Sequence, residues 1–142
     1  MLHPFFVMNV INKGENNIVV FTLEEKRTLT SPYYLIRMIS RAGLNEKRFI
    51  LVNDSTTAVD RYNRFTVTET SGTEVLTSGT VTLSPTGFWD YEIYEQLSSS
   101  NLNQQSADNP LPLETGLVVV KSAAGTDNYF SEVPAGDKFY TP

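Results

Sequence analysis

The segment 87–96 constrains the fold more than any other part of the chain. It contains the single tryptophan, Trp89, and two of the seven tyrosines. At the two-residue period of a β-strand, Trp89, Tyr91 and Ile93 share one face, and the intervening acidic residues share the other. Aromatic rings bury more apolar area than aliphatic side chains do. The sequence therefore predicts a half-buried strand in which Trp89, Tyr91 and Ile93 anchor the core.

Composition limits the class of protein. The 142 residues fit one domain, and 40% hydrophobic with 19% charged residues is typical of a globular chain rather than a disordered one. The absence of cysteine excludes disulfides, thiolate nucleophiles and cysteine-based zinc sites. A net charge of −5 opposes binding to nucleic-acid phosphates. No apolar run approaches the ~20 residues that cross a membrane, so we expect neither a nucleic-acid nor a membrane partner.

Short runs with strand character follow one another at intervals of about ten residues, with turn signals between them. Besides the aromatic strand, they cover residues 5–11, 18–23, 33–39, 46–52, 64–69, 74–76, 80–83 and 117–120. No segment has a helical period. This pattern predicts an all-β fold, an antiparallel β-sandwich of about eight strands with immunoglobulin-like or jelly-roll connectivity. By analogy, the aromatic strand resembles the penultimate strand of an immunoglobulin-like sandwich, where a tyrosine fixes the corner.

Two of these strands are apolar on both faces, namely 18–23 and 117–120. Such strands are either covered on both sides or placed at an interface. The run 97–112 is rich in Ser, Asn and Gln. We expect it to be a long surface loop that is too polar to pack.

The chain is expected to divide into three parts. Residues 1–7 form an N-terminal arm or an extension of the first strand, because they lack the basic region and cleavage site of a signal peptide. Residues 8–121 form the β-sandwich domain. Residues 122–142, with four aromatic residues among Gly and Pro, form an extended C-terminal tail that docks on a neighbour.

Few residues suggest chemistry. His3, the single histidine, has no partner of metal-binding type near it in the sequence. Asp54 and Asp60 could hold calcium, but the spacing of an EF-hand is absent. We therefore predict no metal and no cofactor.

The acidic residues of the aromatic strand, Asp90, Glu92 and Glu95, suggest a carboxylate pair for glycoside hydrolysis. Asp90 and Glu92 also fit the solvated face of a half-buried strand, which is the interpretation we adopt. We accordingly predict no catalytic residue and no enzymatic activity.

Four tyrosine and phenylalanine residues could be exposed, and three roles for them remain open. They are Tyr33, Tyr62, Phe88 and Tyr94. They could stack on sugars, belong to the core, or form a subunit interface.

Several segments resemble a family of small, mostly uncharacterised structural proteins of tailed bacteriophages, crAss-like and marine phages in particular. The matching residues are Asn12–Asn17, Thr28–Leu35, Arg61–Glu69, Gly79–Leu83, Gly87–Trp89, Tyr91–Gln96, Ser98–Ser99 and Asn101–Leu102. The resemblance covers roughly residues 8–121, and the order Tyr-Glu-Ile-Tyr-Glu-Gln is its most specific part.

This resemblance implies a non-enzymatic virion protein, made in the bacterial host cytoplasm and present in the phage particle. The first expectation is an auxiliary or decoration protein bound to the capsid shell. Its partners would be the major capsid protein or neighbouring copies in a multi-copy assembly. The expected contact residues lie in the two terminal segments and are Phe5, Phe6, Val7, Phe130, Phe139 and Tyr140.

Two alternatives stay open. One is a neck, tail or fibre component of the virion with the same sandwich. The other is a carbohydrate-binding β-sandwich module whose partner is a host surface glycan.

Overall fold

The computed structural model describes residues 8–43, 45–53 and 63–122. These residues form strands and two short 3-10 helices, so the all-β class is confirmed. In chain order the elements are β1 (Asn9–Asn12), β2 (Asn16–Phe21), β3 (Tyr33–Ser40), β4 (Glu46–Ile50), β5 (Val52–Asn53), β6 (Asn63–Glu69), η1 (Leu76–Ser78), β7 (Thr80–Val81), β8 (Gly87–Gln96), η2 (Gln104–Ser106) and β9 (Glu114–Lys121).

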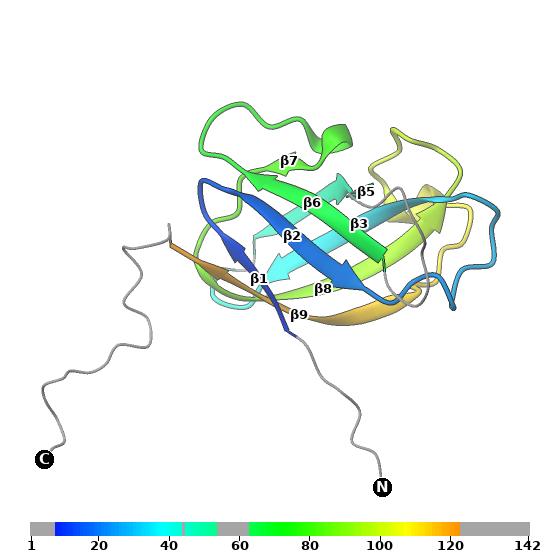
Figure 1. The fold of residues 1–142 in the computed structure, drawn as a ribbon, viewed down its shortest axis with the longest axis horizontal. Helices are drawn as coiled ribbons and strands as arrows, with labels where there is room; N and C mark the ends of the chain where they lie inside the picture. The colour runs from blue at the N-terminus through cyan, green and yellow to red at the C-terminus, as the bar shows by residue number, and fades with distance from the viewer. Residues whose placement is uncertain (1–7, 44, 54–62, 123–142) are drawn as a thin grey trace, which may run out of the picture.

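The strands form two sheets packed face to face (Figure 1). One sheet has five strands in the order β1-β9-β8-β3-β4, and the other has the order β2-β6-β5 with β7 also paired to β6. Variable-type immunoglobulin sandwiches have this order, with strands B, E and D in one sheet and G, F, C and C′ in the other. The connectivity is therefore immunoglobulin-like, and the jelly-roll alternative does not apply.

The sandwich is mainly antiparallel, as expected, but each sheet also contains one parallel pair of strands. β1 runs parallel to β9, with Asn9 opposite Val118 and Asn12 opposite Lys121. β7 runs parallel to β6. The sequence could not indicate this pairing, since β1 and β9 come from opposite ends of the chain.

The two sheets are joined along both long sides. On one side the chain passes from β1 to β2 through a tight turn. The side-chain amide of Asn9 also bridges the gap there, donating to the Val20 carbonyl and accepting from the Val20 N–H, both at 2.9 Å. On the other side β4 continues into β5 through Leu51, whose N–H still donates to the Tyr34 carbonyl of the first sheet at 2.9 Å.

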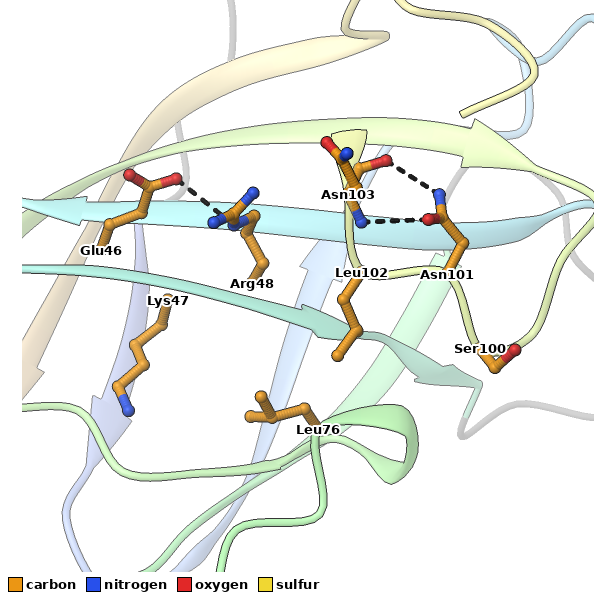
Figure 2. Close-up of a pocket in the computed structure, with 8 residues that line it drawn as sticks. All are labelled: Glu46, Lys47, Arg48, Leu76, Ser100, Asn101, Leu102 and Asn103. Carbon is orange, nitrogen blue, oxygen red and sulfur yellow. Dashed lines mark hydrogen bonds and ion pairs between the residues drawn. The ribbon is translucent and has the colours of Figure 1, made fainter. Parts of the chain in front are cut away.

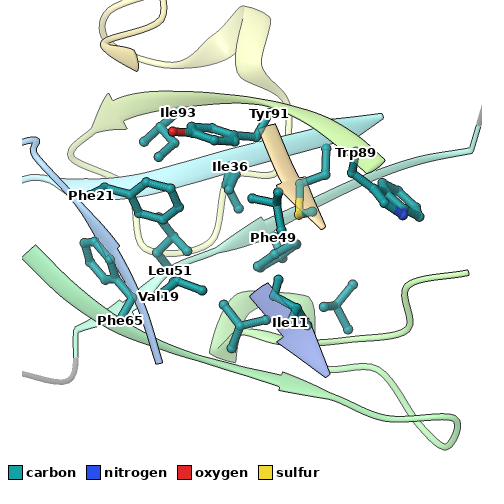
Figure 3. Packing of buried hydrophobic residues seen from close by; sticks show 14 of the residues in the cluster. Ile11, Val19, Phe21, Ile36, Phe49, Leu51, Phe65, Trp89, Tyr91 and Ile93 are labelled. Carbon is teal, nitrogen blue, oxygen red and sulfur yellow. The ribbon is translucent and has the colours of Figure 1, made fainter. Parts of the chain in front are cut away.

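The main core lies between the sheets, and the inner face of β8 is at its centre (Figure 3). Trp89 and Ile93 are completely buried, and Tyr91 is nearly so. The Phe21 ring meets Tyr91 edge-on, with 5.0 Å between the ring centroids. Phe49 of β4 is also completely buried. The aromatic strand therefore packs against rings or aliphatic side chains from both sheets.

Trp89 also fixes the corner at which the chain enters β8. Its indole N–H donates to the carbonyl oxygen of Pro85, four residues upstream, at 3.0 Å. In immunoglobulin domains a tyrosine near the start of strand F makes a comparable bond back to the backbone. The analogy with the penultimate strand therefore applies to β8, but a tryptophan takes the place of the expected tyrosine.

Two local expectations can be compared with the structure. The segment 18–23 was expected to be either covered on both sides or placed at an interface. β2 is an edge strand and Ile18 is 48% exposed on its outer face, so coverage on both sides is wrong and a place at an interface stays a prediction. The segment 74–76 was expected to be a strand. Leu76 is instead the first residue of η1, and the sheet-type pairing described for the segment is a single bridge from Val75 to Thr80.

The polar run 97–112 was expected not to pack, and this is wrong. The 97–113 loop, which includes η2, lies over the outer face of the five-stranded sheet. There Ala107 and Leu102 pack against Leu35, Ile50 and Tyr94 to form a second small core. Two apolar side chains of the loop are enough to form this small core, because the sheet supplies its other three residues.

Candidate functional site: a groove along the free edge of β4

β4 is the last strand of the five-stranded sheet, and no strand among the described residues lies beside one of its edges. The backbone bonds from Ser40 N to Asn45 O and from Leu51 N to Tyr34 O show that odd-numbered residues of β4 bond to β3. The N–H and C=O groups of Glu46 and Arg48 therefore point away from the sheet. No residue that the structure describes is recorded as their backbone partner.

This edge forms the floor of an open groove of about 660 Å³. One wall is the 97–113 loop, and the other is η1. The lining residues are Glu46, Lys47, Arg48, Leu76, Ser100, Asn101, Leu102 and Asn103. Figure 2 shows Leu76 and Leu102 approaching the groove from opposite walls. The groove therefore offers unpaired backbone groups between two leucines, with polar side chains around the rim.

The charged side chains of β4 are drawn away from the free edge. Lys47 Nζ lies 2.7 Å from Glu74 Oε2, on the η1 side. Arg48 donates to the Gln104 side-chain oxygen at 3.1 Å, on the loop side, and lies 3.4 Å from Glu46. Edge lysines and arginines commonly protect a strand against pairing with another chain. Here the side chains of Lys47 and Arg48 bond to the walls of the groove, so the backbone of β4 stays accessible.

The loop wall is held in shape by its own side chains. Asn101 accepts from the backbone N–H of Asn103 at 3.1 Å and donates to its carbonyl at 2.8 Å. Asn101 also donates to the side chain of the buried Gln96 at 2.8 Å. A groove whose wall is already ordered loses little conformational entropy when a ligand binds.

Arginine–carboxylate pairs cover the middle of the outer sheet face. Arg37 contacts Glu46 at 2.6 Å and Glu92 at 3.0 Å, and Glu92 also accepts from the Tyr94 hydroxyl at 2.6 Å. The hydrogen bond from Arg37 lowers the pKa of Glu46. Burial, followed by the bond to Glu92, raises the pKa of Tyr94 to about 12. Both carboxylates are partners of Arg37, and the pKa of Glu46 is lowered rather than raised as in a general acid.

The three acidic residues of β8 do not converge. Asp90 forms two 3.0 Å bonds with Arg41 on the outer face. Glu95 lies on the opposite face and is completely buried. It accepts the backbone N–H groups of Thr28 and Leu29 and a 3.1 Å bond from the Asn109 amide. Burial by itself raises the pKa of Glu95, but the bonds from Thr28, Asn109 and Leu29 outweigh it, so the pKa is lowered.

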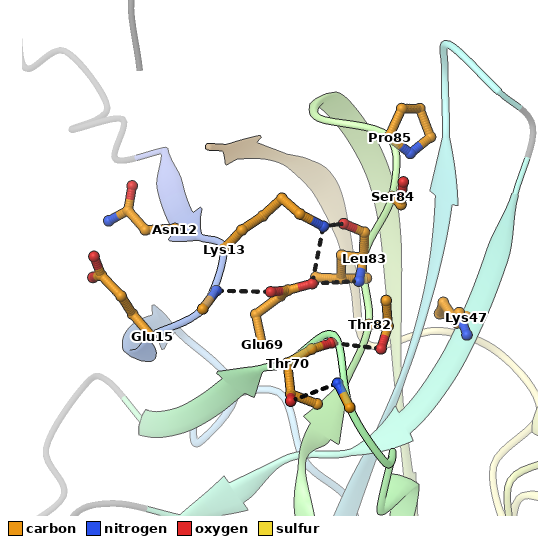
Figure 4. Close-up of polar contacts among 12 residues, drawn as sticks. Asn12, Lys13, Glu15, Lys47, Glu69, Thr70, Thr82, Leu83, Ser84 and Pro85 are labelled. Carbon is orange, nitrogen blue, oxygen red and sulfur yellow. Dashed lines mark hydrogen bonds and ion pairs between the residues drawn. The ribbon is translucent and has the colours of Figure 1, made fainter. Parts of the chain in front are cut away.

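A second buried carboxylate, Glu69 at the end of β6, binds three segments together (Figure 4). Its two oxygens accept the N–H of Gly14 at 2.8 Å, that of Leu83 at 2.9 Å, and Lys13 Nζ at 3.1 Å. Lys13 Nζ also donates to the Leu83 carbonyl at 2.6 Å. Both oxygens of Glu69 already accept from groups of the other two segments, so the cluster holds the three segments together. Within the described part of the chain, no three His, Cys, Asp or Glu side chains group as metal ligands would.

The expected site residues divide into two sets. The core anchors Trp89, Tyr91 and Ile93 are all buried. The expected contact residues fall in 1–7 and 123–142, outside the described residues; they are Phe5, Phe6, Val7, Phe130, Phe139 and Tyr140. His3, Asp54 and Asp60 also lie outside the described residues. None of the helices described is both long enough and apolar enough to cross a bilayer.

The four aromatic residues with open roles do not lie together. Tyr94 belongs to the second small core, and Tyr62 lies outside the described residues. Tyr33 and Phe88 are exposed, but Tyr33 is opposite Gln96, eight residues along β8 from Phe88. That separation is about 26 Å at the rise of a β-strand. Tyr33 and Phe88 therefore form no common platform for a sugar.

The sequence did not indicate the groove. Its floor and walls come from segments 46–48, 76 and 100–103, and only the tertiary fold brings them together. The one local sign was Leu102, an apolar residue in a run otherwise rich in Ser, Asn and Gln.

Comparisons with known proteins yield one distant structural similarity. No protein-family model matches the chain, and no curated protein matches it. A crystal structure from Bacteroides vulgatus ATCC 8482, described as "a putative glycoside hydrolase", matches with a TM-score of 0.42 and 11% identity. The match covers 83% of this chain but only 17% of that chain. A similarity at this level carries no conclusion about activity.

Proposed function

We propose that this chain is a non-enzymatic structural protein of a tailed bacteriophage particle, an auxiliary or decoration protein on the capsid shell. The observation that carries the proposal is that the buried and paired carboxylates bond to groups of the same chain. The carboxylates Glu69, Glu92 and Glu95 hold strands and loops of the same chain together. Meanwhile, among the described residues, the edge of β4 and one end of the outer sheet face remain available for protein contacts.

The outer sheet face supports the proposal. Val10, Val119 and Phe88 are opposite one another on the neighbouring strands β1, β9 and β8. Val10 is 39% and Phe88 is 42% exposed, so the three form an apolar row at the end of the sheet. The segments 1–7 and 123–142 adjoin β1 and β9, the two strands that carry most of this row. An apolar row flanked by such segments is suited to contact with a neighbouring protein.

The proposal is tested in purified particles of the phage that encodes the chain. We expect mass spectrometry to find the protein in the particles, and a low-resolution particle map to place it on the head in hundreds of copies. Deletion of residues 1–7 or 123–142 should abolish incorporation, while the circular dichroism spectrum of the sandwich is retained. Normal incorporation of both deletion variants, or absence of the protein from particles, would contradict the proposal.

Copy number separates the proposal from its closest alternative. A neck, tail or fibre component would be present in about a dozen copies or fewer, by the symmetry of such assemblies. The carbohydrate-binding alternative predicts that polysaccharide changes the fluorescence of an exposed aromatic site. Because Trp89 is completely buried and Tyr33 and Phe88 lie far apart, we expect no response on a glycan array.

A further inference from the structure

The free edge of β4 has the features of a peptide-binding groove. We propose that it binds an extended segment by strand addition, and that the occupant is residues 128–133 of a second copy of this chain. The inference deepens the proposed function, on which it rests, by naming the contact that joins neighbouring copies.

The backbone geometry supports strand addition. The N–H and C=O groups of Glu46 and Arg48 face outward and lack a backbone partner among the described residues. An added strand would satisfy them with the spacing of a sheet ladder. Unpaired edge groups of this kind are the usual starting point for pairing with another chain.

The two walls of the groove limit which kind of partner can lie beside β4. η1 on one side and the 97–113 loop on the other flank β4 (Figure 2). A neighbouring strand lies about 4.8 Å away in the plane of the sheet, which places it between these walls. The edge of a second folded sandwich would bring its own sheet and loops into that space. A single extended segment brings only its own side chains.

Residues 128–133 have the pattern that the groove requires. Their sequence is Asn-Tyr-Phe-Ser-Glu-Val, followed by Pro134, which would end a strand. As a strand, Phe130 and Glu132 point to one side and Tyr129, Ser131 and Val133 to the other. On the outer side of β4, an aromatic ring can cover Leu102 while a carboxylate meets Arg48. On the inner side, Tyr129 or Val133 can contact Leu76.

The tail is long enough to reach the groove of a second copy, which the multi-copy assembly of the proposed function would supply. The tail begins after β9, which is separated from β4 by β8 and β3. The 20 residues 123–142 span up to about 70 Å when extended, which is enough to reach a neighbouring molecule.

Cross-linking tests this contact directly, because the chain has no cysteine of its own. Ser100→Cys places a thiol on the exposed rim of the groove, and Ser131→Cys places one in the proposed strand. The two full-length variants are mixed in equal amounts and treated with a short bismaleimide. We expect a cross-linked dimer in which mass spectrometry joins the peptide of residue 100 to that of residue 131.

The matched control is Ile18→Cys, which lies on the exposed edge strand β2 of the other sheet. Mixed with Ser131→Cys, it should give at most one tenth of the cross-linked dimer. Equal yields from both pairs would overturn the proposal. A Ser100→Cys, Ser131→Cys double variant that cross-links only within one chain, as a monomer, would overturn the second copy as the occupant.

Two further variants change the tail without altering the sandwich. Phe130→Asp removes the ring proposed to cover Leu102, and it should weaken self-association in analytical ultracentrifugation at least tenfold. Ala135→Asp introduces the same charge outside the proposed strand, at a residue that is not among the expected contact residues, and should leave self-association unchanged. Equal effects of the two substitutions would contradict the assignment of residues 128–133.

These measurements use purified protein and no phage particle. A positive cross-link therefore stands even if the protein proves absent from virions, which would refute the proposed function alone. Incorporation into particles without the cross-link would refute the groove contact alone.

Discussion

At the scale of single residues, a few positions are packed so closely that a larger side chain would not fit. Gly116 of β9 is opposite Tyr91, and a Cβ atom at position 116 would lie 2.8 Å from the Tyr91 hydroxyl and 2.9 Å from two ring carbons. The Tyr91 hydroxyl in turn donates to Glu114 at 2.6 Å. The ring is therefore held between the backbone of β9 and the core.

Gly116→Ala is expected to destabilise the protein by about 1–3 kcal/mol, because the Tyr91 ring must move out of a packed position. Urea unfolding followed by Trp89 fluorescence measures the change. Gly72→Ala is the matched control, since its Cβ would meet only the Thr70 hydroxyl at 3.4 Å. Equal effects of the two substitutions would show that the close approach to Tyr91 does not matter.

Glu95 is a second residue that its neighbours constrain, because its buried carboxylate accepts several hydrogen bonds. Glu95→Gln should cost about 2–3 kcal/mol at pH 7, because it replaces a charged acceptor with an amide that also places N–H groups against N–H donors. Chemical denaturation measures the loss. Asp90→Asn breaks an exposed ion pair with Arg41 and should cost less than about 1 kcal/mol.

The pH dependence follows from the lowered pKa of Glu95. A carboxylate whose pKa is lower in the folded state contributes stability above its unfolded pKa of about 4.3. That contribution is lost as the pH falls through the lower folded value. Glu95→Gln should therefore reduce the loss of stability between neutral and acidic pH. Part of it should remain, because the pKa values of Glu46 and Glu74 are lowered as well. An unchanged pH profile would contradict this role of Glu95.

At the scale of elements, the 97–113 loop behaves as part of the sheet that it covers. Ala107 is buried and Leu102 packs beside it, and Asp108 accepts the backbone N–H of Leu97 at 3.0 Å. The loop therefore forms one wall of the groove in a defined position, which a mobile loop could not do.

Ala107→Asp should release the loop without unfolding the main core, because it places a charge in the small second core only. We expect faster amide hydrogen exchange across residues 97–113, with exchange in β2 and β6 unchanged. Ser106→Asp, at an exposed neighbouring position, is the control. Unchanged exchange in the 97–113 loop of the Ala107→Asp variant would contradict the packing described.

At the scale of the whole molecule, the sandwich depends on how its two sheets are joined. Asn9 is the side chain that connects β1 of one sheet to the open edge of β2 in the other. Without it, the outward-facing N–H and C=O groups of Val20 would lose their partner. The joint is specific, because the amide of Asn9 carries a donor and an acceptor on separate atoms and so bonds both backbone groups of Val20 at once.

Asn9→Ala should lower the free energy of unfolding by about 1–2 kcal/mol, because it removes two hydrogen bonds from a largely buried position. The dependence on urea should keep its slope, since the fold and its buried area are retained. Asn16→Ala, at the exposed start of β2, should change stability by less than about 0.5 kcal/mol. A similar loss in both variants would contradict the bridging role of Asn9.

The sequence by itself determined the all-β class and the position of most strands, because strand periodicity and turn residues act over a few neighbouring positions. It also identified β8, since Trp89, Tyr91 and Ile93 alternate with charged residues within a single strand. It left open whether 18–23 is covered or lies at an interface, and it wrongly predicted that 97–112 does not pack, because exposure depends on which other segments lie nearby.

Only the tertiary structure decided the parallel pairing of β1 with β9, the burial of Glu69 and Glu95, and the groove along β4. Each of these brings together residues that are distant in the chain. The preference of each residue for a strand or a turn does not predict such contacts, because they form only when the two sheets pack around a shared core.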